Sequence, residues 1–257
     1  MAARRGLMLP SKFSLQTDTC VAYSAIQELR DGEEGLARYN RDVVKKLRIG
    51  LAINTDEKRP LINLVEFGAG TGTLAEVWRG LYELDPICIE IDPVLIGILK
   101  SKGFKTHSNI KSLSSSISHI YTSNVLEHIE DDVTALSMIR AKMDKGGRIA
   151  IYVPALPFLF SDMDRSIGHF RRYKKSELLE KVKLAGYEIE NCFYNDGIGV
   201  LASLAMRTLG YKNIVGLGSK QSLLFYDRFV YPVSKILDKI LLKHVIGKNL
   251  FLFATNP

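Results

Sequence analysis

Short apolar runs alternate with amphipathic stretches along most of the chain, and this alternation predicts a parallel β-sheet covered by helices. An apolar run that carries few charges and ends at polar turns is typical of a strand buried on both faces. The expected strands are Leu61–Phe67, Ile87–Ile91, Ser118–Thr122, Arg148–Val153, Tyr187–Tyr194 and Asn249–Ala254. The expected crossover helices are Thr73–Leu81, Pro93–Lys102, Asp131–Lys142 and Lys175–Ala185.

Two helical regions flank this core. Apolar positions recur at helical spacing in Ala22–Leu51, which predicts an N-terminal helical cap over residues 1–60. A helical lid is expected at residues 196–248, inserted between the core segments 61–195 and 249–257. An apolar stripe in the lid has basic residues on the opposite side of the helix. Such a stripe usually packs into the core of a protein, but it also suits a helix that lies in a lipid interface, and the sequence leaves both interpretations open. The stripe consists of Phe229, Val233, Ile236, Ile240 and Leu241.

Composition narrows the class of protein. The chain has 257 residues, of which 46% are hydrophobic and 25% charged, so it should fold as one α/β unit with decoration. Arg4 and Arg5 precede only a short apolar run, so we expect no signal peptide, and no apolar stretch reaches the ~20 residues that span a bilayer. Its three cysteines have no metal-ligand spacing. A reducing, cytoplasmic location without a metal is expected.

Charge is unevenly placed, because the net charge of +7 includes eight Lys/Arg against two Asp in residues 197–257. Aromatic residues for base stacking do not interleave with these basic residues, so we expect no nucleic-acid partner. A solvated basic surface and a contact with an anionic membrane, at its inner face, are the two interpretations that remain.

A glycine-rich turn and a following acid carry the first chemical signal. VEFGAGTG places Gly68, Gly70 and Gly72 between a strand and a helix, where a backbone without side chains can approach a ligand closely. Glu90 ends the next strand 20 residues after Gly70, which suits a carboxylate that binds ribose hydroxyls. If the glycines are considered without Glu90, the alternative is a tight turn that binds no ligand. A nicotinamide-dependent oxidoreductase is the weaker interpretation, because its GxGxxG motif needs glycine where Thr73 stands.

VEFGAGTG, CIEIDP and NVLEHIEDD together resemble the motifs of class I S-adenosylmethionine-dependent methyltransferases. The resemblance implies a Rossmann-like seven-stranded α/β sheet, closed by an antiparallel last strand, with S-adenosylmethionine as cofactor. It implies that Glu66 organises the amino-acid end of the cofactor, that Glu90 binds ribose and that Ile91 flanks adenine. The cofactor-binding positions carried over are Glu66, Gly68, Ala69, Gly70, Gly72, Glu90, Ile91 and Asn124.

Two positions depart from the family pattern. The family usually has an acid near the adenine amine, where this chain has residues 107–110, and an aspartate opening strand four, where it has Ser118 and His119. A non-catalytic methyltransferase-like protein with a degenerate cofactor pocket is therefore an alternative.

The substrate side is expected after strands four and five. His128 follows strand four and is either a general base or a histidine that caps the next helix. DRSIGHFRRY resembles a signature of bacterial small methyltransferases that often accompany glycan-assembly enzymes, and His169 in it is the stronger candidate for the base. Arg171, Arg172 and Tyr173 are expected to bind substrate, because arginine pairs suit carboxylate or phosphate. We expect salt bridges, not a metal, at Asp162 and Asp164.

The sequence thus predicts methyl transfer to an oxygen or nitrogen of a small-molecule or glycan-type substrate. An acidic or lipid-linked substrate is one option, and peripheral contact with an anionic membrane is one of the two interpretations of the basic segment.

Overall fold

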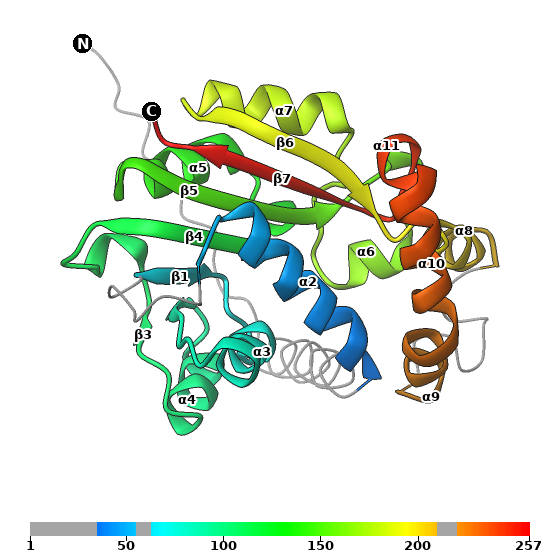
Figure 1. The fold of residues 1–257 in the computed structure, drawn as a ribbon, viewed down its shortest axis with the longest axis horizontal. Coiled ribbons are helices and arrows are strands. Elements are labelled where there is room, and N and C mark those ends of the chain that lie inside the picture. The colour runs from blue at the N-terminus through cyan, green and yellow to red at the C-terminus, as the bar shows by residue number, and fades with distance from the viewer. Residues whose placement is uncertain (1–34, 55–62, 210–219) are drawn as a thin grey trace, which may run out of the picture.

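The computed structural model describes residues 35–54, 63–209 and 220–257 (Figure 1). Its strands form one seven-stranded sheet in the order β3-β2-β1-β4-β5-β7-β6. β7 runs antiparallel to β5 and β6, and the other neighbouring pairs are parallel. The predicted Rossmann-like sheet and its antiparallel last strand are confirmed. The strands are β1 (Leu64–Phe67), β2 (Ile87–Ile89), β3 (Thr106–His107), β4 (Ile117–Ser123), β5 (Met143–Pro154), β6 (Glu188–Asn195) and β7 (Asn249–Thr255).

Helices cover both faces of the sheet, with α2 lying across the near face in Figure 1. Local sequence sets where several of them begin: Asp92 accepts the backbone N–H of Val94 at 2.7 Å to open α4, and Asp131 accepts that of Thr134 at 3.0 Å to open α5. The described helices that precede β6 are α2 (Ala37–Gly50), α3 (Thr73–Tyr82), α4 (Pro93–Ser101), α5 (Asp132–Arg140), α6 (Asp162–Ser166) and α7 (Lys175–Leu184), with short 3₁₀ turns η1 (Ile110–Ser112), η2 (Leu126–His128) and η3 (Pro157–Leu159).

Successive residues of the central strands enter two different cores. Ile149 and Ile151 of β5 pack with α5 and α7, whereas Ala150 and Tyr152 pack with α2 and α3. Neighbouring strands alternate in the same way, because side chains along a strand point to opposite faces. The near-continuous apolar runs of the sequence therefore reflect burial on both faces.

The structure corrects several element boundaries. β3 was not predicted, because its two residues contain no apolar run. β5 begins at Met143, five residues before the predicted start, since Met143 pairs with Ile117 of β4, and Gly146 and Gly147 exchange backbone hydrogen bonds with Asn256. Part of the predicted N-terminal helix, residues 22–34, and the first residues of the first strand, 61–62, lie outside the described residues.

Between β6 and β7, residues 199–209 and 220–245 are helical. A run from 220 to 245 passes from α9 (Lys220–Phe225) through π-helical η5 (Tyr226–Val230), α10 (Tyr231–Leu237) and π-helical η6 (Asp238–Leu242) to α11 (Lys243–Val245), after α8 (Gly199–Leu209). Within the described ranges, no helix combines the length and apolarity needed to cross a bilayer. The division into cap, core and lid stays a prediction.

This helix run is turned with its polar side inward. Asp227, Ser234 and Asp238 are buried, whereas Phe229 and Ile240 are 55% and 73% exposed. The apolar stripe therefore does not pack into the core, because the side of the helix run that faces α2 and β6 is occupied by polar residues and their partners.

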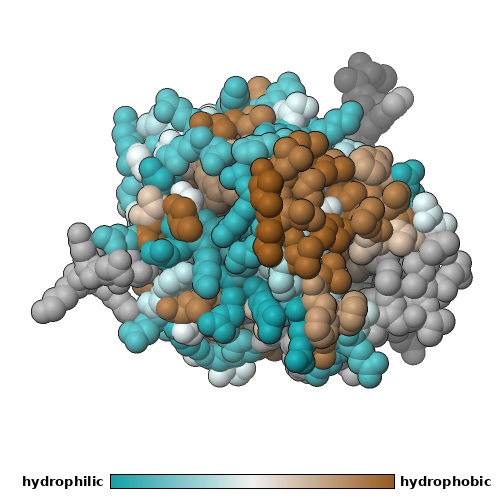
Figure 2. Space-filling model, turned by 45° about the vertical axis from the view of Figure 1, so that its right-hand side comes forward, coloured by the Kyte–Doolittle hydropathy of each residue, from teal (hydrophilic) through white to brown (hydrophobic). Residues whose placement is uncertain are grey.

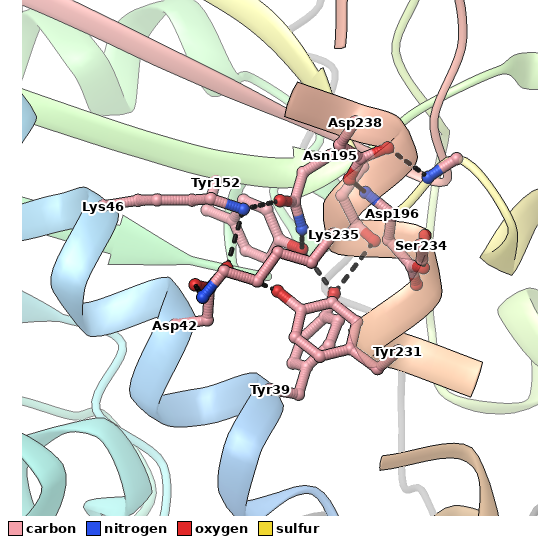
Figure 3. Close-up of polar contacts among 12 residues, drawn as sticks. Tyr39, Asp42, Lys46, Tyr152, Asn195, Asp196, Tyr231, Ser234, Lys235 and Asp238 are labelled. Carbon is pink, nitrogen blue, oxygen red and sulfur yellow. Dashed lines mark hydrogen bonds and ion pairs between the residues drawn. The ribbon is translucent and has the colours of Figure 1, made fainter. Parts of the chain in front are cut away.

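Polar contacts join the helix run to α2 and to the end of β6 (Figure 3). The Tyr231 hydroxyl donates to the Asp42 carboxylate of α2 at 2.6 Å. The Asp238 carboxylate accepts the backbone N–H groups of Asp196 and Gly197 at 2.8 and 3.0 Å. These bonds satisfy groups that would otherwise be buried without partners.

Asp227 supplies the N-terminal cap of α2 from a distant part of the chain. Leu36, at the cap position of that helix, offers no side-chain hydrogen bond. The Asp227 carboxylate instead accepts the backbone N–H groups of Arg38 and Tyr39 at 2.9 and 2.8 Å. These are the donors that a local cap would satisfy, at the positive end of the helix dipole.

We predict that Asp227→Ala lowers the free energy of unfolding by about 1–2 kcal/mol, because two partly buried backbone donors lose their acceptor. Urea denaturation measures the change. Asp162→Ala is the control, since it removes an exposed carboxylate that pairs with Arg165 among the described residues, and should change stability by less than about 0.5 kcal/mol. Equal effects of the two substitutions would contradict the long-range cap.

Candidate active site

The glycine-rich turn between β1 and α3 is fixed against the ends of two neighbouring strands. The backbone N–H groups of Gly68 and Ala69 both donate to the Ile89 carbonyl of β2, at 2.8 and 3.1 Å. Gly68 has φ +77°, and a Cβ there would lie 2.3 Å from Cγ2 of Val125, which follows β4. Only glycine fits this close approach. The turn therefore lies where the carboxyl ends of β1, β2 and β4 meet.

Glu90 connects that turn to the end of β2. Its side chain is buried, and Oε2 accepts the backbone N–H of Gly70 at 2.8 Å. Oε1 accepts those of Ile91 and Asp92 at 2.7 and 3.0 Å. A carboxylate offers about four acceptor sites, so these donors orient Glu90 and leave it acceptor capacity. The side chain of Ile91 beside it is 82% exposed, an open apolar surface at this edge.

Glu66 is buried under the same turn. Its Oε2 accepts no hydrogen bond from the described residues. Burial, followed by the nearby charge of Glu90, raises the pKa of Glu66 to about 8. A buried acceptor without a partner fits a site that receives a polar or positively charged group from a ligand.

The remaining predicted cofactor positions lie along this edge. Gly72 opens α3 and donates its N–H to the Ala69 carbonyl at 2.9 Å. Asn124 has a left-handed φ of +53°, and its side chain is exposed just past β4. β3 brings His107 beside β2, where its carbonyl accepts the N–H of Glu90 at 3.0 Å. Asn109, in the segment without the family's acid, is exposed next to it.

Asp164 organises the loop after β5. Its Oδ2 accepts the N–H and the hydroxyl of Ser161 at 2.9 and 3.0 Å. Its Oδ1 faces Nδ1 of His169 and Nε of Arg172, each at 2.9 Å. Burial disfavours its charge, but hydrogen bonds from His169 and Arg172 prevail and hold the pKa of Asp164 far below its usual range. The predicted salt bridges of the DxD pair are confirmed, here and at Asp162 with Arg165.

The two histidines that the sequence singled out lie against each other. The rings of His128 and His169 meet edge to face, with centroids 4.5 Å apart. His169 is nearly buried and His128 is exposed. The N–H of Phe170 donates to the Glu127 carbonyl at 2.8 Å, which joins the loop after β5 to the turn after β4.

Glu127 is a residue whose role the sequence analysis missed. Its side chain is fully buried, its Oε1 lies 3.8 Å from Nε2 of His169, and neither carboxylate oxygen has a hydrogen-bond partner in the described structure. Burial raises the pKa of Glu127 to about 8. The sequence signal was its position beside His128 in a strand-end motif, but an acid in such a turn is ordinarily solvated.

The predicted substrate residues have internal partners. Arg171 donates to Asp132 at 2.8 Å, and so does the Tyr173 hydroxyl at 2.7 Å. Tyr173 is fully buried and Arg172 is 8% exposed. In this structure they hold the loop after β5 in place, and their direct contact with substrate stays a prediction.

Comparisons with known proteins agree with this geometry. A family model described as a methyltransferase domain matches residues 33–191. No curated protein matches the sequence at a significant level.

Among solved structures, a chain of the Haloferax volcanii complex that contains the Trm112 methyltransferase activator has a TM-score of 0.58 at 12% identity, over 96% of this chain and 100% of that one. A SAM-dependent methyltransferase from Archaeoglobus fulgidus has a TM-score of 0.52 at 15% identity, over 84% and 94%. Phosphoethanolamine N-methyltransferase 2 from Haemonchus contortus, in complex with S-adenosyl-L-methionine, has a TM-score of 0.52 at 12% identity, over 82% and 52%. These likenesses show the fold.

The family match spans more than half of the chain and coincides with the strands that form the glycine turn and the buried acids. The chain therefore belongs to the methyltransferase family, and S-adenosylmethionine is its cofactor.

Proposed function

We propose that this chain transfers the methyl group of S-adenosylmethionine to an oxygen or nitrogen of a small or glycan-related substrate that is acidic or lipid-linked. The observation that carries the proposal is the link between the glycine turn and the histidine pair. Gly68 packs against Val125, and the Val125 carbonyl accepts the N–H of His128 at 2.9 Å. In this proposal the turn from Val125 to His128 thus connects the cofactor-binding glycine turn to the histidines that accept the proton.

The residues at the ends of β1 and β2 fit the cofactor. In this proposal Glu90 accepts a hydrogen bond from a ribose hydroxyl at its remaining acceptor site. Glu66 faces the amino-acid end with its unpaired Oε2, and exposed Ile91 covers one side of adenine. Asn124 completes the site from the end of β4.

When bound, S-adenosylmethionine supplies an electrophilic methyl group, and the accepting oxygen or nitrogen must release a proton. His169 or His128 takes that proton in this proposal. Ionised Asp164 accepts a hydrogen bond from Nδ1 of His169, so Nε2 is the free acceptor on that ring. Alignment of the nucleophile with the methyl group provides most of the acceleration, so a modest base is sufficient.

An acidic substrate is supported by the arginines beside the histidines. Arg171 and Arg172 place two guanidinium groups in this loop, and Nη1 of Arg172 has no hydrogen-bond partner among the described residues. Guanidinium groups bind carboxylate and phosphate oxygens well.

A lipid-linked substrate is supported by the outward side of the helix run. Apolar side chains gather on this side of the molecule (Figure 2), and exposed basic residues accompany them. We propose that this surface rests on an anionic membrane. An exposed apolar stripe of this extent needs a nonpolar partner, and its basic residues complement anionic headgroups. The surface consists of Phe225, Phe229, Val233, Ile236, Ile240 and Leu241, with Lys220, Arg228 and Lys239.

We predict that Glu90→Ala weakens S-adenosylmethionine binding roughly 10- to 100-fold, because a hydrogen bond to a carboxylate, worth about 1.5–3 kcal/mol, is lost. Isothermal titration calorimetry measures the affinity, and thermal unfolding checks the fold. Glu188→Ala, an exposed acid on β6, is the matched control and should bind normally. Unchanged affinity in Glu90→Ala would contradict the ribose assignment. If the wild type bound a nicotinamide dinucleotide instead, the oxidoreductase hypothesis would replace the proposal, and if it bound neither, a non-catalytic role would.

Glu66 gives a prediction about pH and stability. Its pKa is raised to about 8 in the folded protein, so between about pH 4.5 and 8 the folded state keeps a proton that the unfolded state has released. The free energy of unfolding of the ligand-free protein therefore falls as pH rises through this window. Glu66→Gln removes this titration and should reduce the slope by up to about 1.4 kcal/mol per pH unit. Denaturation between pH 5 and 8 tests this, and identical slopes would contradict it.

The membrane proposal predicts co-sedimentation with vesicles that contain phosphatidylglycerol and weak binding to neutral phosphatidylcholine vesicles. High salt should release the protein, because each basic residue contributes about 1 kcal/mol that ions screen. Ile240→Asp should weaken the attachment. Leu184→Asp alters an equally exposed leucine on α7 and should leave it unchanged. Equal non-binding to both vesicle types would reject the proposal.

A further inference from the structure

We propose that Glu127, His128 and His169 form a binding site for one divalent transition-metal ion. One ring nitrogen of each histidine and one carboxylate oxygen of Glu127 all lie within 4.8 Å of one another. Ligand atoms that bind one ion at about 2.0–2.2 Å are themselves separated by roughly 3–4 Å. Nε2 of His169 and Oε1 of Glu127, 3.8 Å apart, already meet this condition. A small rotation of the exposed His128 side chain would bring its ring nitrogen into place as the third ligand.

The buried carboxylate of Glu127 is an independent observation that points to a cation. Neither of its oxygens accepts a hydrogen bond from the described residues, although the side chain is fully buried. Burying a carboxylate without hydrogen-bond donors costs free energy of folding, and a bound cation is one of the few partners that can compensate for that cost. Arg172, whose positive charge is nearby, directs Nε to Asp164 and makes no hydrogen bond to Glu127. A metal ion between Glu127 and His169 would satisfy the carboxylate.

The surroundings of His169 are those of a metal ligand. Histidines that bind metals usually donate their other ring N–H to a carboxylate, which fixes the ring and leaves one nitrogen for the ion. Nδ1 of His169 makes this bond to Asp164 at 2.9 Å, and Ser161 holds Asp164 from the other side. Nε2, the nitrogen left over, is the one that faces Glu127.

The donor set indicates both the class of ion and its role. Two imidazole nitrogens and one carboxylate oxygen suit zinc, manganese or a similar first-row ion and leave coordination positions open. Because His128 is exposed, the open side is accessible from solvent. The role of the ion rests on the proposed function, in which it takes the place of the histidine base, since both histidines would be bound to it: it would bind an oxygen of the substrate and make its proton easier to lose. The sequence led us to expect no metal, and this proposal replaces that expectation.

The test uses full-length protein without a histidine tag, treated with a chelator and titrated with Co²⁺ and Zn²⁺. Visible absorption should show Co²⁺ bound to nitrogen ligands, and calorimetry should show one ion per chain. Glu127→Gln and His128→Ala should each weaken binding at least about 10-fold. His128 is exposed, so its substitution should leave the fold intact. His119→Ala removes a histidine from the first half of β4 and should bind the ion as the wild type does.

S-adenosylmethionine binding by the same samples separates the two proposals. A wild type that binds the cofactor but no stoichiometric ion, or that binds the ion as tightly after His128→Ala and Glu127→Gln, overturns the metal site and leaves the proposed function standing. A wild type that binds the ion at these residues but no cofactor overturns the proposed function and leaves the metal site.

Discussion

Covering the sheet on both faces is the constraint on which the rest of this structure depends. β1, β4 and β5 pack apolar residues against helices on either side, so most of the side chains buried along them are apolar. Side chains that could meet a ligand are therefore concentrated at the carboxyl ends of the strands and in the turns that follow them. The glycine turn, the acid after β2 and the histidine pair all lie in such turns.

Four buried acids at this edge are accommodated in two different ways. Glu90 and Asp164 are surrounded by hydrogen-bond donors, and each fixes the turn or loop around it. Glu66 and Glu127 are equally buried but have oxygens without partners. A buried acid without partners destabilises the ligand-free protein, and a bound ligand can compensate for that cost. The first two acids position the site, and the second two are suited to receive its ligands.

The helix run before β7 follows the opposite rule from the core. Its inner side is polar because Asp227, Tyr231 and Asp238 satisfy donors and acceptors on α2 and β6. Its apolar residues therefore face outward. Hydrophobic periodicity shows that a helix has two sides, but it does not show which side faces the protein.

The sequence by itself determined the class of fold and the identity of the cofactor. Apolar runs identify strands because both faces of the sheet are buried, and the spacing from Gly70 to Glu90 is set by one helix and one strand that the local sequence specifies. Tertiary structure alone decided what depends on contacts between distant segments. Glu127 and His169 lie 42 residues apart in sequence, yet their side chains approach each other in the folded protein without forming a hydrogen bond. No local sequence pattern predicts such a contact. Asp227 likewise caps α2 from 188 residues away, because only folding brings an acceptor to those backbone donors.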